Sequence, residues 1–81
     1  MSLPEDLDKE KLAEAALAIL SLSRMTGPDY MQAWKGMDWD VMNLLHENDW
    51  ISDPVGKQKS VYFSEEGIKR ADEFLIKHFG K

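Results

Sequence analysis

The sequence contains no cysteine, which removes two common ways of stabilising a short chain. Neither a disulfide nor a thiolate zinc site can form. The two histidines, His46 and His78, would need several carboxylates beside them to make a four-ligand metal site. Because 81 residues bury only a modest share of their surface, we expect association with protein to add stability. We predict no metal and no cofactor.

Long apolar runs and a basic leader are also missing. No stretch approaches the 18 apolar residues that suggest a membrane-spanning helix. The first 12 residues are acidic and have no basic region followed by an apolar one, so they do not resemble a secretory signal. We therefore expect a cytoplasmic protein without membrane contact.

Basic residues are scarce before position 57. Residues 1–56 hold 11 acidic and 4 basic side chains, a net charge of −7. Residues 57–81 hold 4 acidic and 6 basic side chains, a net charge of +2, so the chain carries −5. Duplex binding uses lysine and arginine to displace counterions, so this balance disfavours nucleic acid as a partner. The mildly basic end is most simply a solvated helix face.

Apolar residues that recur every three or four positions predict three main helices, over about residues 9–25, 38–48 and 65–79. Asp38 and Ser64 stand where a side-chain oxygen can cap a first helical turn. In the first helix Ala13 and Leu17 widen the apolar face and Leu22 lies behind it, which suggests contacts on two sides. The positions expected to face inward are Leu12, Ala16, Ile19, Leu20 and Ser23, then Val41, Met42, Leu44 and Leu45, then Ile68, Ala71, Leu75 and Phe79.

A β-hairpin is expected between the last two helices. One strand begins at Trp50–Ile51, and residues 57–63 return along it. Alternation places Val61 and Phe63 on one face and Tyr62 on the other.

The junctions between these elements carry three more expectations. Residues 53–56 read Asp-Pro-Val-Gly, the composition of a tight turn. Asn48–Asp49 must leave the helix in left-handed geometry, which both residue types tolerate. Within the connector at 26–37, Tyr30–Lys35 is predicted as a short helical turn, with a short strand as the alternative.

The order of helix, short helix, helix, hairpin and helix resembles that of winged helix-turn-helix domains. LLHENDWI followed by SVYFSEEGIKRADEF is similar to the second half of many bacterial examples, which have a Gly-Leu-Ile stop, a wing and then Leu-Thr-Glu-Glu-Gly. Asp49 stands where that pattern has glycine. The resemblance implies one α+β, mainly helical domain over residues 1–81, winged helix-turn-helix-like, with three main helices and one β-hairpin wing.

Most of the chain also resembles a family of short bacterial proteins of unknown function. The shared features are a Trp-Lys-x-x-Asp-Trp-Asp segment and an Asp-Pro-x-x-Lys-x-Lys-Ser wing. They correspond here to Trp34, Lys35, Asp38, Trp39, Asp40, Asp53, Pro54, Lys57, Lys59 and Ser60. This resemblance implies the fold and no activity.

Trp34, Met37, Trp39 and Trp50 form the first candidate site. They fall within 17 residues, and a core this small has little room for three tryptophans that bury about 150–250 Å² each. Apolar surface left exposed marks an interface. We predict a dimer or partner surface first, core packing second and a small-molecule pocket third.

Lys57 and Lys59, with Lys35, form a second candidate site that would contact phosphate as a basic wing. Lysines at alternate strand positions also protect an exposed edge against aggregation, and we prefer this interpretation. The preceding helix is a poor reader of base edges, because residues 37–50 contain no lysine or arginine. That stretch carries four carboxylates instead: Asp38, Asp40, Glu47 and Asp49.

No catalytic constellation is recognisable. Helix capping and turn formation already explain Asp38 and Asp53, and the chain has no glycine-rich phosphate loop, nucleophile elbow or His-Glu metal pair. We therefore predict a non-enzymatic protein-interaction module. It is expected to form a homodimer through the first helix, the last helix or the tryptophans. The alternative is a DNA-associated transcriptional regulator that contacts phosphate through its wing.

Overall fold

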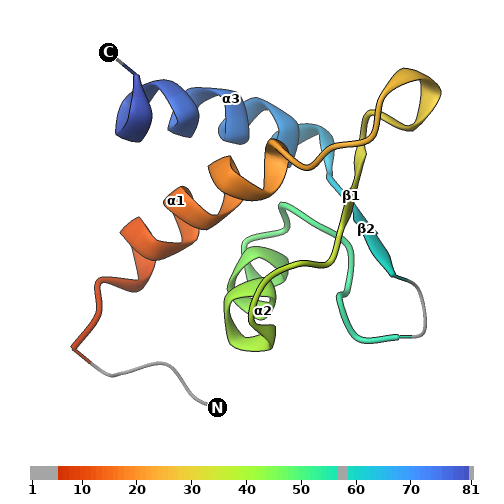
Figure 1. Cartoon of the computed structure of the whole chain (residues 1–81). Coiled ribbons are helices and arrows are strands. Elements are labelled where there is room, and N and C mark those ends of the chain that lie inside the picture. Colours follow the sequence, from red (N-terminus) through yellow and green to blue (C-terminus); the bar gives the residue numbers. More distant parts are fainter. Residues whose placement is uncertain (1–5, 57–58, 81) are drawn as a thin grey trace.

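The computed structural model describes residues 6–56 and 59–80 (Figure 1). Within these residues the fold is α+β and mainly helical, as predicted, with three helices and a two-stranded antiparallel sheet. This arrangement is consistent with a winged-helix-like domain. The elements are α1 (Lys9–Ser21), the 3-10 turn η1 (Gly27–Asp29), β1 (Gln32–Trp34), α2 (Trp39–Glu47), β2 (Ser60–Tyr62) and α3 (Glu65–Phe79).

Helices α1 and α3 lie side by side and run in opposite directions (Figure 1). Midway along α1, Glu14 reaches Lys77 and His78 at the end of α3. Beyond the C-terminal end of α1, Arg24 lies 3.9 Å from Asp72 in the middle of α3. The second contact of α1 is with α2, so α1 is covered from two directions.

Helix α1 ends at Ser21, four residues earlier than predicted. The backbone N–H groups of Leu22 and Ser23 bond to carbonyls only three residues back, which tightens the last turn. Arg24 then forms a β-bridge with Ala33. The long-range bridge therefore takes the chain out of the helix before Gly27 and Pro28 are reached.

The helical turn predicted at Tyr30–Lys35 is wrong, and the alternative, a short strand, is what forms. Strand β1 occupies this segment and pairs antiparallel with β2, with Ala33 opposite Val61. Gly27 has φ 72°, which lets η1 turn the chain back from Arg24. Ala33 has no exposed surface, so pairing and burial together decide its conformation.

Of the predicted hairpin, the described residues form a single β-bridge, between Ile51 and Phe63. The Ser52 N–H also donates to the Tyr62 carbonyl over 2.8 Å. Strand β2 therefore lies between β1 and the Ile51 segment. Asp53 Oδ1 accepts from the Val55 N–H over 2.9 Å, and this Asx turn leads the chain away after one bridge.

The helix boundaries that depend on local capping are confirmed. Asp38 Oδ2 accepts from the Asp40 N–H over 3.0 Å, and Ser64 Oγ accepts from the Gly67 N–H over 2.9 Å. Asp49 has φ 61°, the left-handed conformation that the sequence required of it. The Trp50 N–H then reaches back to the Leu45 carbonyl over 3.1 Å and closes the end of α2.

The core is centred on a different face of α1 from the one predicted. Ile19 and Ser23, expected inside, are exposed, and so is Phe79 of α3. Phe74 is buried in place of Phe79 because its ring packs on Trp50. The buried apolar residues are Ala13, Ala16, Leu17, Ala18, Leu20, Ala33, Met42, Leu45, Ile51, Val61, Phe63, Ala71 and Phe74.

Candidate interaction surfaces

The structure places Trp50 away from Trp39 and gives the four residues of the predicted tryptophan site different exposures. Trp34 lies on β1 and is 56% exposed, while Trp39 opens α2 and is 58% exposed. Met37 and Trp50 are partly buried against the core. Trp50 follows the C-terminal end of α2, and Trp39 stands at its start. The nine residues of this helix span about 13 Å at 1.5 Å per residue. The four side chains therefore do not form one cluster.

Trp50 acts as a core residue. Its ring meets the ring of Phe74 edge-on, with centroids 5.4 Å apart and an interplanar angle of 61°. Its carbonyl accepts the N–H of Ser64 over 2.9 Å, which ties α2 to the start of α3. Of the three interpretations of the predicted tryptophan site, core packing therefore describes Trp50 best.

Trp34 and Tyr62 lie on the outer face of the sheet. In the register, Trp34 is opposite Ser60 and Gln32 is opposite Tyr62, so these four side chains share the face that points away from buried Ala33 and Val61. Tyr62 is 50% exposed. Diagonal neighbours on one face are about 7–8 Å apart, within reach of aromatic rings. We call Gln32, Trp34, Ser60 and Tyr62 the aromatic sheet face.

A small hollow of about 130 Å³ lies beside the start of α2. Its walls are mostly apolar, and one cation stands at its rim. Lys35 Nζ lies 5.9 Å from the centroid of the Trp39 ring, within cation–π range. We call this the α2 hollow; it is lined by Lys35, Met37, Trp39, Met42 and Pro54.

Two of the three lysines of the predicted basic wing are brought together. The Lys35 N–H donates to the Lys59 carbonyl over 2.9 Å, and Lys59 is exposed. Lys57 lies outside the described residues. By strand alternation both lysines share the face of Ala33 and Val61, and Lys35 lines the α2 hollow, so a cation stands at this hollow although the whole chain is acidic.

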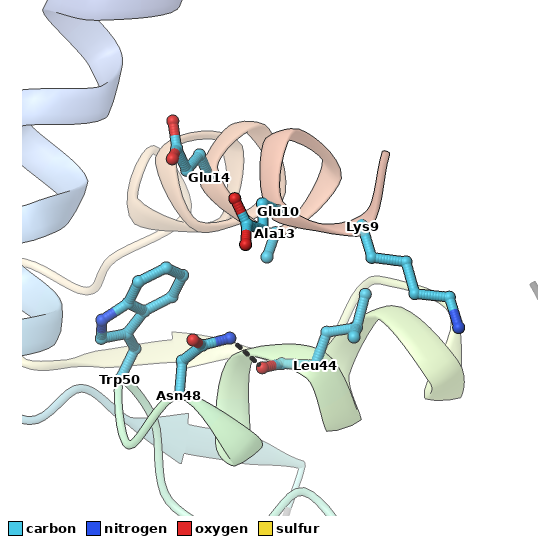
Figure 2. A pocket seen from close by; sticks show the side chains of 7 residues that line it. All are labelled: Lys9, Glu10, Ala13, Glu14, Leu44, Asn48 and Trp50. Carbon is cyan, nitrogen blue, oxygen red and sulfur yellow. Dashed lines mark hydrogen bonds between the residues drawn. The ribbon is translucent and has the colours of Figure 1, made fainter. Parts of the chain in front are cut away.

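A larger hollow of about 310 Å³ lies between α1 and the end of α2 (Figure 2). Trp50, Leu44 and Ala13 provide apolar surface there, and Lys9 and Glu10 stand on the α1 side. Figure 2 shows Asn48 turned toward Leu44, whose carbonyl accepts from its Nδ2 over 2.7 Å. Glu14, the remaining polar residue in the lining, is engaged elsewhere.

Glu14 forms a clasp between α1 and α3. Its Oε1 lies 2.9 Å from Lys77 Nζ and 2.8 Å from His78 Nε2. The hydrogen bond from Lys77 and, to a lesser degree, the one from His78 hold the pKa of Glu14 below its ordinary value of 4.5. Because Glu14 is committed to this clasp and Asn48 to α2, Lys9 and Glu10 are the charged residues of the lining that remain to orient a ligand.

Across 6–56 and 59–80, no group of three or more His, Cys, Asp or Glu side chains is placed to hold a metal ion. In the same residues, no helix has both the length and the apolar character to cross a membrane. His46 sits at the end of α2, where its Nδ1 lies 3.1 Å from the Ile51 carbonyl.

The structure thus defines a small α+β domain with two exposed tryptophans, Trp34 and Trp39, and with Lys35 beside the second of them. A family model described as a domain of unknown function, DUF6429, matches residues 8–81, and the chain belongs to this family. It is also 39% identical over 74 residues to the uncharacterized protein y4hR of Sinorhizobium fredii, across 91% of this chain and 96% of that relative. No solved structure matches the chain.

Proposed function

We propose that this domain is a non-enzymatic protein-interaction module and that its partner docks on the aromatic sheet face and the α2 hollow. The observation that carries the proposal is the exposure of Trp34 and Trp39, both above one half, in a domain whose core is filled without them. Trp and Tyr are over-represented among the residues that dominate binding energy at protein interfaces. Tyr62, which the sequence did not single out, lies with Trp34 on the aromatic sheet face.

The chemistry of the surface favours an acidic segment with one apolar anchor side chain. The α2 hollow, at about 130 Å³, has space for one such side chain between Trp39, Met37 and Pro54. Lys35 and Lys59 would attract carboxylates around that anchor and orient the segment. A basic partner would instead face the carboxylates of Asp38 and Asp53, but it would also meet both lysines.

Site-specific photo-crosslinking tests the proposal in cells that express the full chain. A benzophenone side chain replaces Trp34 or Trp39, and the control carries it at Lys69, an exposed position on α3. Adducts to one acidic protein from positions 34 and 39, absent from position 69, are expected. A synthetic peptide from that protein should then bind the wild type at least tenfold more tightly than Trp39→Ala. Absence of protein adducts from both tryptophan positions would refute the proposal.

The DNA-associated alternative is kept because one observation favours it. Lys35 and Lys59 are adjacent across the base of the wing, where two lysines can neutralise neighbouring phosphates. The acidic residues of α2 oppose this, since Asp38, Glu47 and Asp49 are all exposed. Electrophoretic shifts of duplex DNA at low and moderate salt separate the two functions. Tight binding with a steep salt dependence, reduced in Lys35→Ala/Lys59→Ala, would favour the regulator.

A further inference from the structure

Helix α1 carries a second apolar face that the core does not use. Leu12, Ala15, Ile19 and Leu22 lie along it, on the side away from buried Leu17. Ile19 is 49% exposed and Leu22 is 72% exposed, while Leu12 and Ala15 are partly covered. We call these four residues the outer α1 face. It contains large aliphatic side chains that no described element of the same chain buries completely.

The spacing along this face is that of a helix-packing seam. Positions 12, 15, 19 and 22 advance by three, four and three residues, the alternation that keeps a narrow apolar stripe on one side of a helix. The stripe is also complementary to itself when a second copy runs antiparallel. Leu12 then faces Leu22 of the other copy, and the small Ala15 faces the large Ile19 in both directions. Large and small side chains can therefore interdigitate at both central positions.

We propose that two copies of the chain pair through their outer α1 faces, antiparallel and related by a two-fold axis near position 17. The contact is isologous, since each copy presents the same four side chains to the other. The register is specific, because a parallel pair would put Leu12 against Leu12 and leave Ala15 against Ala15 with a gap.

Charge supports a second copy as the occupant of this face. Two acidic chains repel one another, so a self-contact requires a surface without unpaired carboxylates. Between Leu12 and Ser23 the only charged residue is Glu14. Glu14 lies off the outer face and is bound by Lys77 and His78 of its own chain. The stretch from Leu12 to Ser23 therefore brings no unpaired carboxylate into the contact.

The neighbouring helix α3 also exposes large apolar side chains near its end. Ile76 of α3 is 75% exposed and Phe79 is about half exposed, and α3 lies along α1 (Figure 1). Two packed helices alone bury less than the roughly 800 Å² per partner of a standard interface. The contact therefore belongs to the small, reversible class of interfaces. The tryptophans of the proposed partner surface lie on other elements, so each surface can be removed separately.

Engineered cysteines test the pairing and its register, because the chain has none of its own. Positions 12 and 22 on one helix are about 15 Å apart, well beyond the roughly 7 Å Cα limit of a disulfide. Leu12→Cys/Leu22→Cys should therefore form an intermolecular dimer on mild oxidation. A mixture of the two single variants should give mainly the mixed dimer, and Lys69→Cys should stay largely unlinked. Preferential 12–12 or 22–22 bridges would overturn the antiparallel register.

Solution mass tests the association itself. At roughly 100 µM, a dimer with a Kd near 1 µM is almost fully formed, so the wild type should show twice the mass of one chain by light scattering. Leu22→Glu should halve that mass while its circular dichroism and its peptide binding through Trp39 stay unchanged. A wild-type monomer at this concentration would refute the pairing and leave the partner-docking function standing. A wild-type dimer that Leu22→Glu does not dissociate would also refute it.

Discussion

At the scale of single residues, the effect of a substitution depends on where the residue lies in the fold as well as on its type, as the glycines and tryptophans show. A Cβ added at Gly67 would lie 2.0 Å from the Trp50 carbonyl oxygen, whereas one added at Gly36 meets nothing within 4 Å. Trp50 packs on Phe74, whereas Trp34 stands on the outer sheet face. Identical side chains therefore have different consequences when changed.

Gly67→Ala should destabilise the fold by about 1–3 kcal/mol, because the start of α3 must move away from the Trp50 backbone. Alanine in an ordinary helix interior would instead stabilise by up to about 1 kcal/mol, so the sign is diagnostic. Urea unfolding measures it. Gly36→Ala is the matched control and should change stability by less than about 0.5 kcal/mol. A Gly67→Ala protein as stable as the wild type would contradict the close approach.

Asp49→Gly should stabilise the protein by about 0.5–1 kcal/mol. Asp49 has φ 61°, a left-handed conformation that costs most L-residues roughly 1–2 kcal/mol. Glycine removes this cost, but it also loses more backbone entropy on folding, which offsets part of the stabilisation. Thermal unfolding at fixed protein concentration measures the change. Destabilisation would show that the Asp49 side chain itself supports the end of α2.

The three tryptophans should respond differently to alanine. Trp34→Ala and Trp39→Ala each remove a side chain that is more than half exposed, so we expect losses below about 1 kcal/mol. Trp50→Ala removes the packing on Phe74 and should cost about 3 kcal/mol. Urea unfolding of the three variants distinguishes surface from core. A large loss on Trp39→Ala would mean that the α2 hollow is structural.

At the scale of elements, the clasp between α1 and α3 links folding to pH. The pKa of Glu14 is below its ordinary value because Lys77 and then His78 donate hydrogen bonds to the carboxylate. A carboxylate with a lowered folded pKa stabilises the fold above its unfolded pKa, near 4.5, and loses that contribution as pH falls through the folded value. The clasp therefore weakens in acid.

Glu14→Gln should lower stability by about 1 kcal/mol at pH 6, since a neutral amide replaces charge-assisted acceptors. The difference from wild type should shrink as pH falls below 4.5 and be lost once the pH lies below the lowered pKa of Glu14 in the folded protein. Denaturant titrations at several pH values give the two curves. Glu10→Gln, at an exposed position on the same helix, is the control. A difference that stays constant as the pH falls would point to packing at Glu14, not to its charge.

At the scale of the whole molecule, size and exposed apolar surface favour association. The chain has 81 residues, and large side chains such as Leu22 and Ile76 are about three-quarters exposed. A dimer that forms only from folded chains is stabilised by mass action. The midpoint of thermal unfolding should therefore rise with protein concentration in the wild type and stay constant in Leu22→Glu. A constant midpoint in both proteins would exclude coupling between folding and pairing.

The sequence by itself determined the features that act over three or four residues. Capping by Asp38 and Ser64, the left-handed exit at Asp49 and the alternation of Val61, Tyr62 and Phe63 all follow from neighbouring side chains and backbone geometry. They are confirmed in the structure. The family resemblance likewise placed the chain in a family of unknown function, to which it belongs.

Only the tertiary structure decided what depends on distant partners. Strand β1 forms because it pairs with β2, which follows α2 in the chain. The residues around β1 carry no local pattern that predicts a partner so far away in sequence. The face of α1 that is buried, and hence the exposure of Ile19 and Leu22, depends on where α2 and α3 pack. The tryptophans were separated for the same reason. Local hydrogen bonds are specified by neighbours in sequence, whereas burial is specified by neighbours in space.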